Sequence, residues 1–519
     1  MRLRVTRPLS LLAVALTACT DLPNEPTSAS RVAAVPSAAR GGEQGGNAKT
    51  SLDLIEDDYS AGGIDKQNVN VYREQALSAP DKLPAKYRSS ARGKDATMSL
   101  VSMARDWSSL STATQQEILD LRANGLGDLS ETVETQHFVL HYTTGGNHGV
   151  PLQDADENNI PDFIDAAAQS NEFVWQREVG QLAYPPPIGM PAQKFHVYYK
   201  NLDKYYGVTY PQNVALTATS PVPLGTASGY IVIENDFYGF PPNDEDRTGQ
   251  EVVRTGALKV TQAHEFMHAI QFAINVYQSG WLMESHATWA EDAVYEGVND
   301  WHWYINGFFA TADLPLFSRD PYGGAFFQNW LSENYGVDMP RKIWMAAKTN
   351  TLRDAIRVTA FGGTWEPLKT FAAAEYTLGI SDFTKDPVSV VPLPTRLPIR
   401  DTHTSYPVSV SVGPSTNKVS SRAPWAYGGA NFVELVPAGN GTLTVTFDGT
   451  DGFAWRALAV ATPKNGGAPT VYPISLNGGS AGSIAITGFG TKWSKVTLVP
   501  VIVGEEGAEV TYSYGARIN

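Results

Sequence analysis

Two histidines four residues apart, His264 and His268, carry the clearest chemical signal in this sequence, and Glu265 directly follows the first. They lie in a stretch whose apolar residues recur at helical spacing, which predicts a helix over residues 256–276. Side chains four apart share one face of a helix, so the two imidazoles could grip one metal ion, and neutral imidazole is a good zinc donor. Glu265 could then take a proton from a water molecule at that metal. The pattern predicts a hydrolytic zinc site.

A catalytic zinc ion needs one further protein ligand, and the next helical stretch, residues 281–291, offers three candidates. They are Glu284, His286 and Glu291, and the stretch begins just after Gly280. On a helix His286 points well away from Glu284, whereas Glu291, two turns further on, lies on roughly the same face. These positions alone leave the third ligand open.

The two stretches together resemble the zinc site of gluzincin metallopeptidases, in which a glutamate on a second helix completes the ligand set. Residues 281–288 are similar to the Trp-Leu-Asn-Glu-Gly-Phe-Ala-Ser segment of membrane-alanyl-type aminopeptidases, with Met283 in place of the asparagine. A largely uncharacterised bacterial family of secreted metalloproteases, named mostly by motif, is more similar still. That likeness extends from about residue 138 through the C-terminal region and includes residues 264–271, 284–292 and 322–327.

The resemblance implies a zincin-like catalytic domain in which His264, His268 and Glu284 bind Zn²⁺. It also implies a zinc-dependent metallopeptidase of the gluzincin type, in which Glu265 is the general base for hydrolysis of peptide bonds. Zinc would polarise the scissile carbonyl and lower the pKa of the attacking water. Gluzincins commonly hold substrate against an edge strand near the metal helix, and residues 230–233 could form that strand.

The remaining roles near the metal are assigned from the residues themselves. We expect Glu291 or Asp292 to orient a zinc-binding imidazole through a hydrogen bond, the alternative being a solvated helix face. The tetrahedral intermediate carries an oxyanion that a tyrosine or histidine commonly stabilises. Tyr322, which lies in a glycine-flanked loop, and His286 are the candidates, and we select Tyr322 as the second catalytic residue, against an ordinary packing role.

A second motif, over residues 154–165, has oxygen donors at the spacing of an EF-hand-like calcium loop. Asn159 replaces the usual glycine, and asparagine tolerates the left-handed conformation that the turn needs. The motif predicts a structural Ca²⁺ held by Asp154, Asp156, Asn158, the carbonyl of Ile160, Asp162 and Asp165. The alternative is an acidic surface turn that leads into a helix.

The N-terminus has the features of a bacterial export signal. Residues 1–19 contain three arginines followed by an apolar run over 9–16, and they end in Leu-Thr-Ala-Cys, which resembles a lipobox. We therefore expect Cys19 to carry a lipid anchor, which would make the protein a cell-envelope lipoprotein on the periplasmic or cell-surface side, with extracellular release as a further option. An ordinary signal peptide with a chance cysteine is the alternative. Cys19 is the sole cysteine of the chain, so no intramolecular disulfide can form.

Composition changes along the chain divide it into five parts. We expect a signal peptide over 1–19, a flexible tether over 20–50 and a small helical region over 51–130, which could be a prosegment or a packing unit. A catalytic domain follows over 131–390, with strands near 138–142, 195–199 and 230–233 and helices from 256 to about 377. A proline-rich passage at 386–398 precedes short alternating runs that predict an all-β sandwich over 400–519. The fold class is therefore multidomain α+β, with a catalytic domain that is mostly helical in its C-terminal part.

Composition restricts the partners. The 519 residues carry a formal net charge of −14, which argues against a nucleic-acid partner, and their 42% hydrophobic content is enough for substantial cores. We expect a peptide or protein substrate and a lipid anchor in a bacterial membrane. Two other functions stay open: a catalytically silent binding or adhesion protein that acts through its sandwich, and a zinc hydrolase of non-peptide substrates. The aromatic residues of the sandwich, such as Trp425, Tyr427, Trp455 and Trp493, are expected to pack in the core rather than form a carbohydrate platform.

Overall fold

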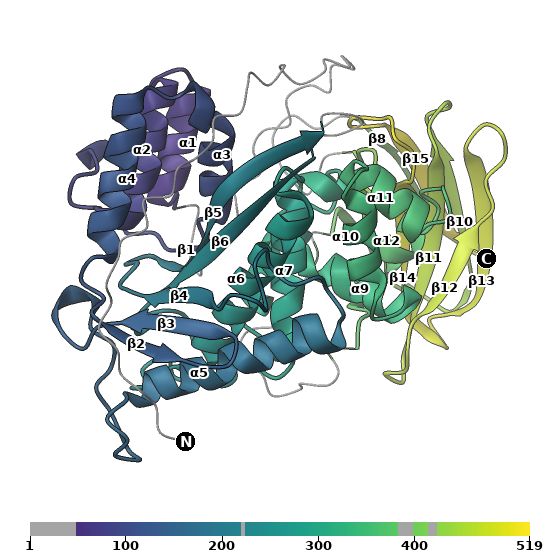
Figure 1. Cartoon of the computed structure of the whole chain (residues 1–519). Coiled ribbons are helices and arrows are strands. Elements are labelled where there is room, and N and C mark those ends of the chain that lie inside the picture. The colour runs from purple at the N-terminus through teal and green to yellow at the C-terminus, as the bar shows by residue number, and fades with distance from the viewer. Residues whose placement is uncertain (1–47, 219–223, 382, 384–396, 398, 414–422) are drawn as a thin grey trace.

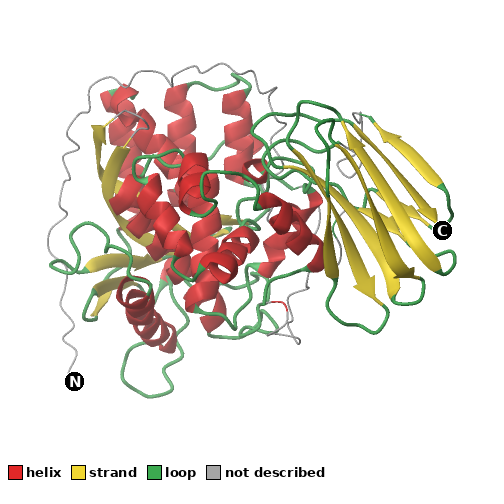
Figure 2. Ribbon diagram, turned by 90° about the vertical axis from the view of Figure 1, so that its right-hand side faces the viewer, coloured by secondary structure: helices red, strands yellow, loops and turns green. Residues whose placement is uncertain are grey.

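The computed structural model describes residues 48–218, 224–381, 383, 397, 399–413 and 423–519. The fold is mixed α and β, with helices and two separate β-sheets. Figure 1 shows the first sheet and the N-terminal helices at one end of the molecule and the C-terminal strands at the other, with a helical layer between them. Figure 2 shows the same helical layer beside the C-terminal strands from a second direction. Among the described residues, no helix is both long and apolar enough to cross a membrane.

The first sheet has six strands in the order β1-β5-β6-β4-β3-β2. Strands β3, β4 and β6 are mutually parallel, β5 is antiparallel to β6, and β1 joins the outer edge of β5 in parallel. The strands are β1 (Gly93–Asp95), β2 (Glu131–Glu134), β3 (Phe138–Tyr142), β4 (Phe195–Tyr199), β5 (Tyr205–Ala218) and β6 (Leu224–Ile233). The three strand segments expected in this region are thereby confirmed.

The N-terminal helices pack on one face of this sheet. They are α1 (Ser51–Ser60), α2 (Lys66–Ser78), α3 (Thr97–Asp106) and α4 (Thr112–Leu126), with short 3₁₀ turns η1 (Ala85–Tyr87) and η2 (Trp107–Ser109). Side chains alternate along a strand, so Val208 and Val232 join the core of these helices while Ile231 and Ile233 face the opposite side. Residues 51–126 are helical as expected, but β1 within them belongs to the sheet.

The opposite face of the sheet is covered by α5 (Asp162–Trp175) and α6 (Thr255–Asn275), and α7 (Gly280–Val294) packs beside α6. The predicted helical region after residue 256 is confirmed. It continues through α8 (His302–Ala310), α9 (Ala325–Tyr335), α10 (Met339–Ala347), α11 (Leu352–Thr359) and α12 (Leu368–Thr377). The shorter elements are η3 (Gly146–His148), the π-helical turn η4 (Gln176–Gln181) and η5 (Leu316–Ser318).

The C-terminal strands enclose a separate apolar core. The strands form two groups, one in the order β7-β9-β14-β11-β12 and the other in the order β13-β10-β15-β8. Strands β13 and β14 are paired at one position, Phe489 with Trp493, and this pair joins the two groups. The result is one nearly barrel-shaped sheet around an apolar core. Trp425, Tyr427, Trp455 and Trp493 are buried, as expected. The strands are β7 (Asp401–His403), β8 (Val408–Val412), β9 (Val433–Leu435), β10 (Gly441–Gly449), β11 (Trp455–Pro463), β12 (Thr470–Ile474), β13 (Ala481–Phe489), β14 (Trp493–Ile502) and β15 (Tyr512–Ile518).

Some expectations fall outside the described residues or are wrong. The export signal with Cys19, most of the tether and nearly all of the proline-rich passage lie outside the described ranges. The assignment of residues 230–233 to an edge strand is wrong, because β6 is hydrogen-bonded to β5 on one side and to β4 on the other. On that side of the sheet the edge strand is β1, which pairs with β5.

Candidate metal centre

Helices α6 and α7 position the histidine and glutamate side chains predicted from the sequence. Most of the 21 residues of α6 are buried, because apolar residues on every side of the helix pack against the sheet, α5 or α7. A short connection after Asn275 turns the chain into α7, and this connection brings Glu284 to the two histidines. The sequence-predicted third ligand is therefore on the correct helix face.

The nitrogen and oxygen atoms that face one another have the separations of a metal site. The Nε2 atoms of His264 and His268 are 3.1 Å apart, and Glu284 Oε2 lies 3.3 Å from the first and 3.7 Å from the second. Two ligands of a tetrahedral zinc ion with bonds near 2.1 Å are separated by about 3.4 Å. The three side chains are buried, and Glu284 Oε2 accepts no hydrogen bond within the described part of the chain. These features fit a bound divalent cation.

Hydrogen bonds behind the two imidazoles fix the orientation that metal binding requires. His264 donates from Nδ1 to Glu291 Oε1 at 2.7 Å, and His268 donates from Nδ1 to Gln271 Oε1 at 2.8 Å. Both protons are thereby assigned to Nδ1, which leaves the Nε2 lone pairs directed at the site. Burial lowers the pKa of His264, which favours the neutral ring. Of the two carboxylates proposed for this role, Glu291 makes the contact, whereas Asp292 bonds to Trp301 and Asn329.

Glu265 lies between the metal-binding residues and strand β5. Its Oε2 accepts a hydrogen bond from Thr209 Oγ1 at 2.6 Å, and Thr97 Oγ1 lies 3.2 Å away. Burial, together with the charge of Asp95, raises the pKa of Glu265 well above its usual range. A β-carbon on Gly207 would come within 2.7 Å of Glu265 Cγ, so the close approach of β5 to the carboxylate depends on this glycine.

Asp95 is a fourth side chain that could bind a metal at this site, and the sequence reasoning missed it. It lies at the end of β1, and its Oδ2 is 3.6 Å from His268 Nε2, so that Asp95, His264, His268 and Glu284 form one cluster. Its carboxylate also accepts hydrogen bonds from the backbone N–H of Thr97 at the start of α3. In the sequence, an aspartate two residues before a threonine indicates only a helix cap. No local signal links it to the distant histidines of α6.

Tyr322 is brought to the metal centre by the loop that precedes α9. Its ring centroid lies 6.3 Å from that of His264 and 5.3 Å from that of Tyr304. Tyr322 lines a cleft of about 500 Å³ together with Glu284, Trp281 and Asp95. One wall of this cleft comes from the N-terminal segment, and the other comes from α7 and the loop that ends at Tyr322.

His286 cannot take the oxyanion role considered for it. Its Nε2 is 2.6 Å from Tyr184 Oη, and its Nδ1 faces Gln271, which separates it from His268. The ring is fully buried between Trp289 and Trp344, and burial lowers its pKa well below the usual range. His286 therefore supports the orientation of Gln271 from the side opposite the cleft.

The loop before α5 brings together three of the predicted calcium ligands. Carboxylate oxygens of Asp154, Asp156 and Asp162 lie within 4.8 Å of one another. Asn159 has φ 66°, so it adopts the left-handed conformation that the motif requires. Asn158 donates a hydrogen bond from Nδ2 to Asp165 Oδ2 at 2.8 Å. Its side-chain oxygen accepts a hydrogen bond from the Ile160 N–H. The amide oxygen therefore faces the backbone rather than the carboxylates.

Comparisons with known proteins give no family for this chain. No family profile matches the sequence, and no curated relative matches it. Among solved structures, one with local similarity is a family GH115 4-O-methyl-α-glucuronidase with specificity for decorated arabinogalactans. It is 10% identical, and the match covers 51% of this chain and 38% of that enzyme, with a TM-score of 0.14. At that score the likeness carries no argument about function.

Proposed function

We propose that the protein is a zinc-dependent metallopeptidase of the gluzincin type. The observation that carries the proposal is the convergence of His264 Nε2, His268 Nε2 and Glu284 Oε2 beside Glu265 in a buried site that opens to a cleft. Two neutral imidazoles and one carboxylate are the ligand set of a catalytic zinc site, which keeps a position for water or substrate.

The chain's own residues account for the proton transfers of peptide hydrolysis. A zinc ion bound by these ligands would supply Lewis-acid polarisation of a peptide carbonyl and would lower the pKa of nearby water. Glu265 takes a proton from the attacking water and returns it to the leaving amine. Thr209 holds the carboxylate in place.

Tyr322 supplies the hydrogen bond to the oxyanion in this proposal. Its position on the wall of the cleft, next to the ring of His264, supports the assignment. The edge of β5, rather than β6, is the surface against which an extended peptide would lie, because β5 is the sheet strand that approaches Glu265.

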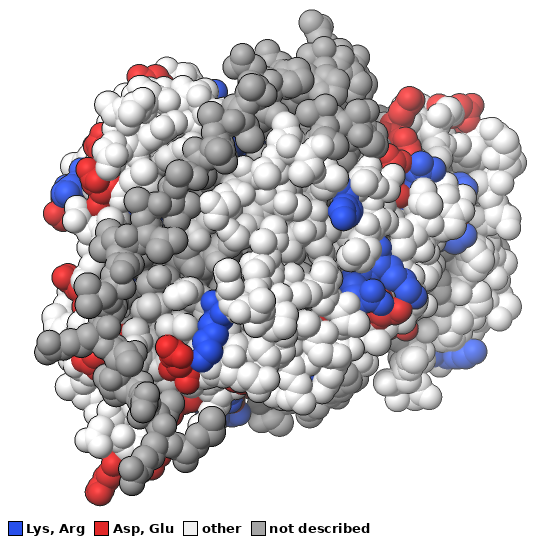
Figure 3. Space-filling view, in the orientation of Figure 1, with Lys and Arg blue, Asp and Glu red and all other residues white. Residues whose placement is uncertain are grey.

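Two further assignments accompany the enzyme. We propose that the loop of Asp154, Asp156 and Asp162 binds a structural Ca²⁺, since three clustered carboxylates next to a left-handed Asn159 repel one another without a cation. We also propose that Cys19 anchors the exported chain to a bacterial membrane. A nucleic-acid partner is not part of the proposal, and on the face shown in Figure 3 the basic side chains lie in small groups near acidic ones.

The experiment that tests the function compares the chain with its Glu265→Gln variant. Zinc content is measured by elemental mass spectrometry, and cleavage of casein is measured in the same samples. We expect about one zinc ion per chain in both proteins and, in the unmodified chain, a low but measurable zinc-dependent cleavage that the variant lacks. Bound zinc without any cleavage that depends on Glu265 would instead favour a silent binding protein or a hydrolase of other substrates.

A further inference from the structure

The N-terminal segment touches three parts of the metal centre through residues that are almost adjacent in sequence. Lys94 Nζ lies 3.0 Å from Glu291 Oε2, the carboxylate that orients His264. Asp95 belongs to the metal-ligating cluster, and Thr97 Oγ1 lies 3.2 Å from Glu265 Oε2. Packing on the sheet alone does not account for these contacts. One short segment contacts the proposed ligands, the carboxylate of Glu291 and the proposed general base Glu265.

We propose that Asp95 is the fourth ligand of the bound metal and that β1 occupies the substrate groove, so that the folded chain is an inhibited precursor. This inference rests on the proposed zinc site. Three protein ligands leave one position for water and substrate, and a fourth protein ligand closes the site. The Asp95 carboxylate is buried, with 1% of its side chain exposed, and its Oδ2 is at a ligand-to-ligand distance from His268 Nε2.

Strand β1 also occupies the surface that an extended peptide would use. It pairs with β5 at Gly93 with Tyr205 and at Asp95 with Gly207, and Gly207 is the residue against which Glu265 packs. A peptide that bound by adding a strand to β5 would need the same backbone groups. The cleft beside the metal centre is lined by residues of this segment from Ala48 to Arg105, so the segment forms much of the wall of the cleft in front of the ligands.

A buried lysine holds β1 in place. Lys94 Nζ lies 2.7 Å from Asp300 Oδ2, and both side chains are almost fully buried. Withdrawal of β1 would remove the cation that pairs with the buried carboxylates of Asp300 and Glu291, which is costly, so β1 does not leave by simple thermal fraying.

Release of β1 need not remove the N-terminal helices. Helices α1 to α4 share an apolar core with β5 and β6 that includes Tyr205, Val208 and Val232, and loss of these helices would expose that core. The strand itself spans three residues and has two paired positions on β5. The movable part is therefore the stretch around β1, between η1 and α3, while the helices stay docked.

The test uses the full chain loaded with Co²⁺ in place of zinc, whose visible absorption reports the ligands. Acetohydroxamate, a small metal-binding anion, is added to the chain and to its Asp95→Asn variant, which keeps the shape of the side chain and an acceptor for the Thr97 N–H. We expect no spectral change in the unmodified chain at concentrations that change the spectrum of Asp95→Asn. Zinc affinity, measured by competition with a chelator, is expected to fall about tenfold or more in Asp95→Asn. The control is Asp81→Asn, an exposed aspartate in the same segment.

Casein cleavage separates this inference from the function on which it rests. We expect cleavage by zinc-loaded Asp95→Asn to exceed that of the unmodified chain, because the substitution opens the metal position and removes one of the contacts that hold β1, and to vanish when Glu265→Gln is added. A spectral response to acetohydroxamate in the unmodified chain and in Asp81→Asn would overturn the inference even if Asp95→Asn failed to fold. Unchanged zinc affinity in a folded Asp95→Asn would overturn it as well. If acetohydroxamate reaches the metal of Asp95→Asn but no cleavage depends on Glu265, Asp95 remains the ligand that closes the site. The proposed peptidase activity is then refuted.

Discussion

His264 donates a 2.7 Å hydrogen bond from Nδ1 to Oε1 of Glu291, across the interface between α6 and α7. The bond fixes the tautomer and the direction of a proposed metal ligand. Glu291→Gln should lower zinc affinity about 10-fold to 100-fold, because outer hydrogen-bond partners commonly have that effect. The measurement is a chelator competition. Asp292→Asn is the matched control, since this neighbour bonds to Trp301 and Asn329 instead. Equal losses of zinc affinity in the two variants would show that a general disturbance of helix α7, rather than loss of the Glu291 hydrogen bond, weakens zinc binding.

Gly207 sets the distance between β5 and Glu265. An alanine β-carbon there would meet Glu265 Cγ at 2.7 Å and Thr261 Cγ2 at 2.8 Å. Gly207→Ala should therefore displace Glu265, destabilise the fold by about 1–3 kcal/mol and reduce Glu265-dependent cleavage, while the zinc content stays near that of the unmodified chain. The comparison is with Gly145→Ala, whose added carbon meets no atom within 4 Å. Unreduced cleavage per bound zinc ion in Gly207→Ala would contradict the role assigned to Glu265.

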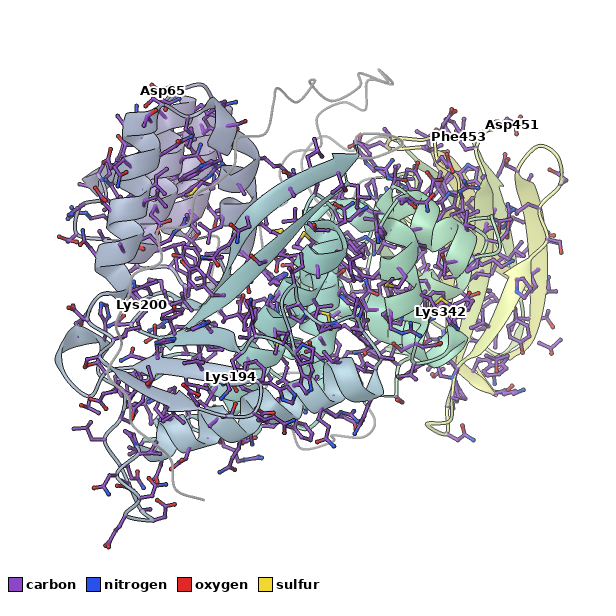
Figure 4. The ribbon with its side chains drawn as sticks, in the orientation of Figure 1. Asp65, Lys194, Lys200, Lys342, Asp451 and Phe453 are labelled. Atoms are coloured by element: carbon purple, nitrogen blue, oxygen red, sulfur yellow. The ribbon has the colours of Figure 1, made fainter. Side chains whose placement is uncertain are left out.

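The acidic loop before α5 should make thermal stability depend on calcium. A ligand that binds only the folded state stabilises it by about 3 kcal/mol at a hundred times its dissociation constant. Millimolar Ca²⁺ should raise the melting temperature of the metal-depleted chain, and Asp156→Asn should remove most of that rise. Asp451→Asn is the control, because Asp451 is exposed in the C-terminal β-region, far from this loop (Figure 4). An equal response to Mg²⁺ and Ca²⁺ in all three proteins would argue for a general ionic effect.

Glu234, which directly follows β6, should make stability fall as the pH rises. Burial raises the pKa of Glu234 to about 8, although its carboxylate accepts a hydrogen bond from the Leu202 N–H. A folded carboxyl that holds its proton more tightly than the unfolded one stabilises the fold at low pH. That contribution is lost as the pH rises from about 4.5 through 8.

The measurement for Glu234 is chemical unfolding of the full chain at pH 5 and pH 8. Glu234→Gln should flatten the decline in unfolding free energy, because a tenfold difference in proton affinity between the folded and unfolded chain is worth about 1.4 kcal/mol. Glu506→Gln, at an exposed position, should leave the decline unchanged. Parallel curves for the unmodified chain and Glu234→Gln would show that Glu234 is ionised in the folded state at both pH values.

The candidate site could be predicted from the sequence where it depends on local periodicity. The shared face of His264 and His268 follows from helical spacing, whereas the choice of Glu284 on the next helix depends on the resemblance to gluzincins. Helical spacing also narrows the carboxylate that orients a histidine to two candidates, Glu291 and Asp292. The strand composition of β3 and β4 is rich in β-branched and aromatic residues, and alternate side chains along both strands are buried in the core on the side of α5 and α6.

The rest of the site depends on contacts between residues that are distant in sequence. Asp95 reaches His268 because a three-residue strand joins the edge of β5, and a strand that short has no detectable period. The edge position expected for residues 230–233 is wrong because composition indicates that a segment is a strand but not which strands pair with it. His286 points away from Glu284, as the helical spacing indicates, and its ring nitrogens contact Tyr184 and Gln271.

Anomalous diffraction at the zinc edge, from crystals of the zinc-loaded full chain, tests the central claim most directly. The account predicts one strong peak within bonding distance of His264 Nε2, His268 Nε2 and a carboxylate oxygen of Glu284. A chain that crystallises in excess zinc with no peak at these three atoms, or with Glu284 turned away from the peak, would contradict it.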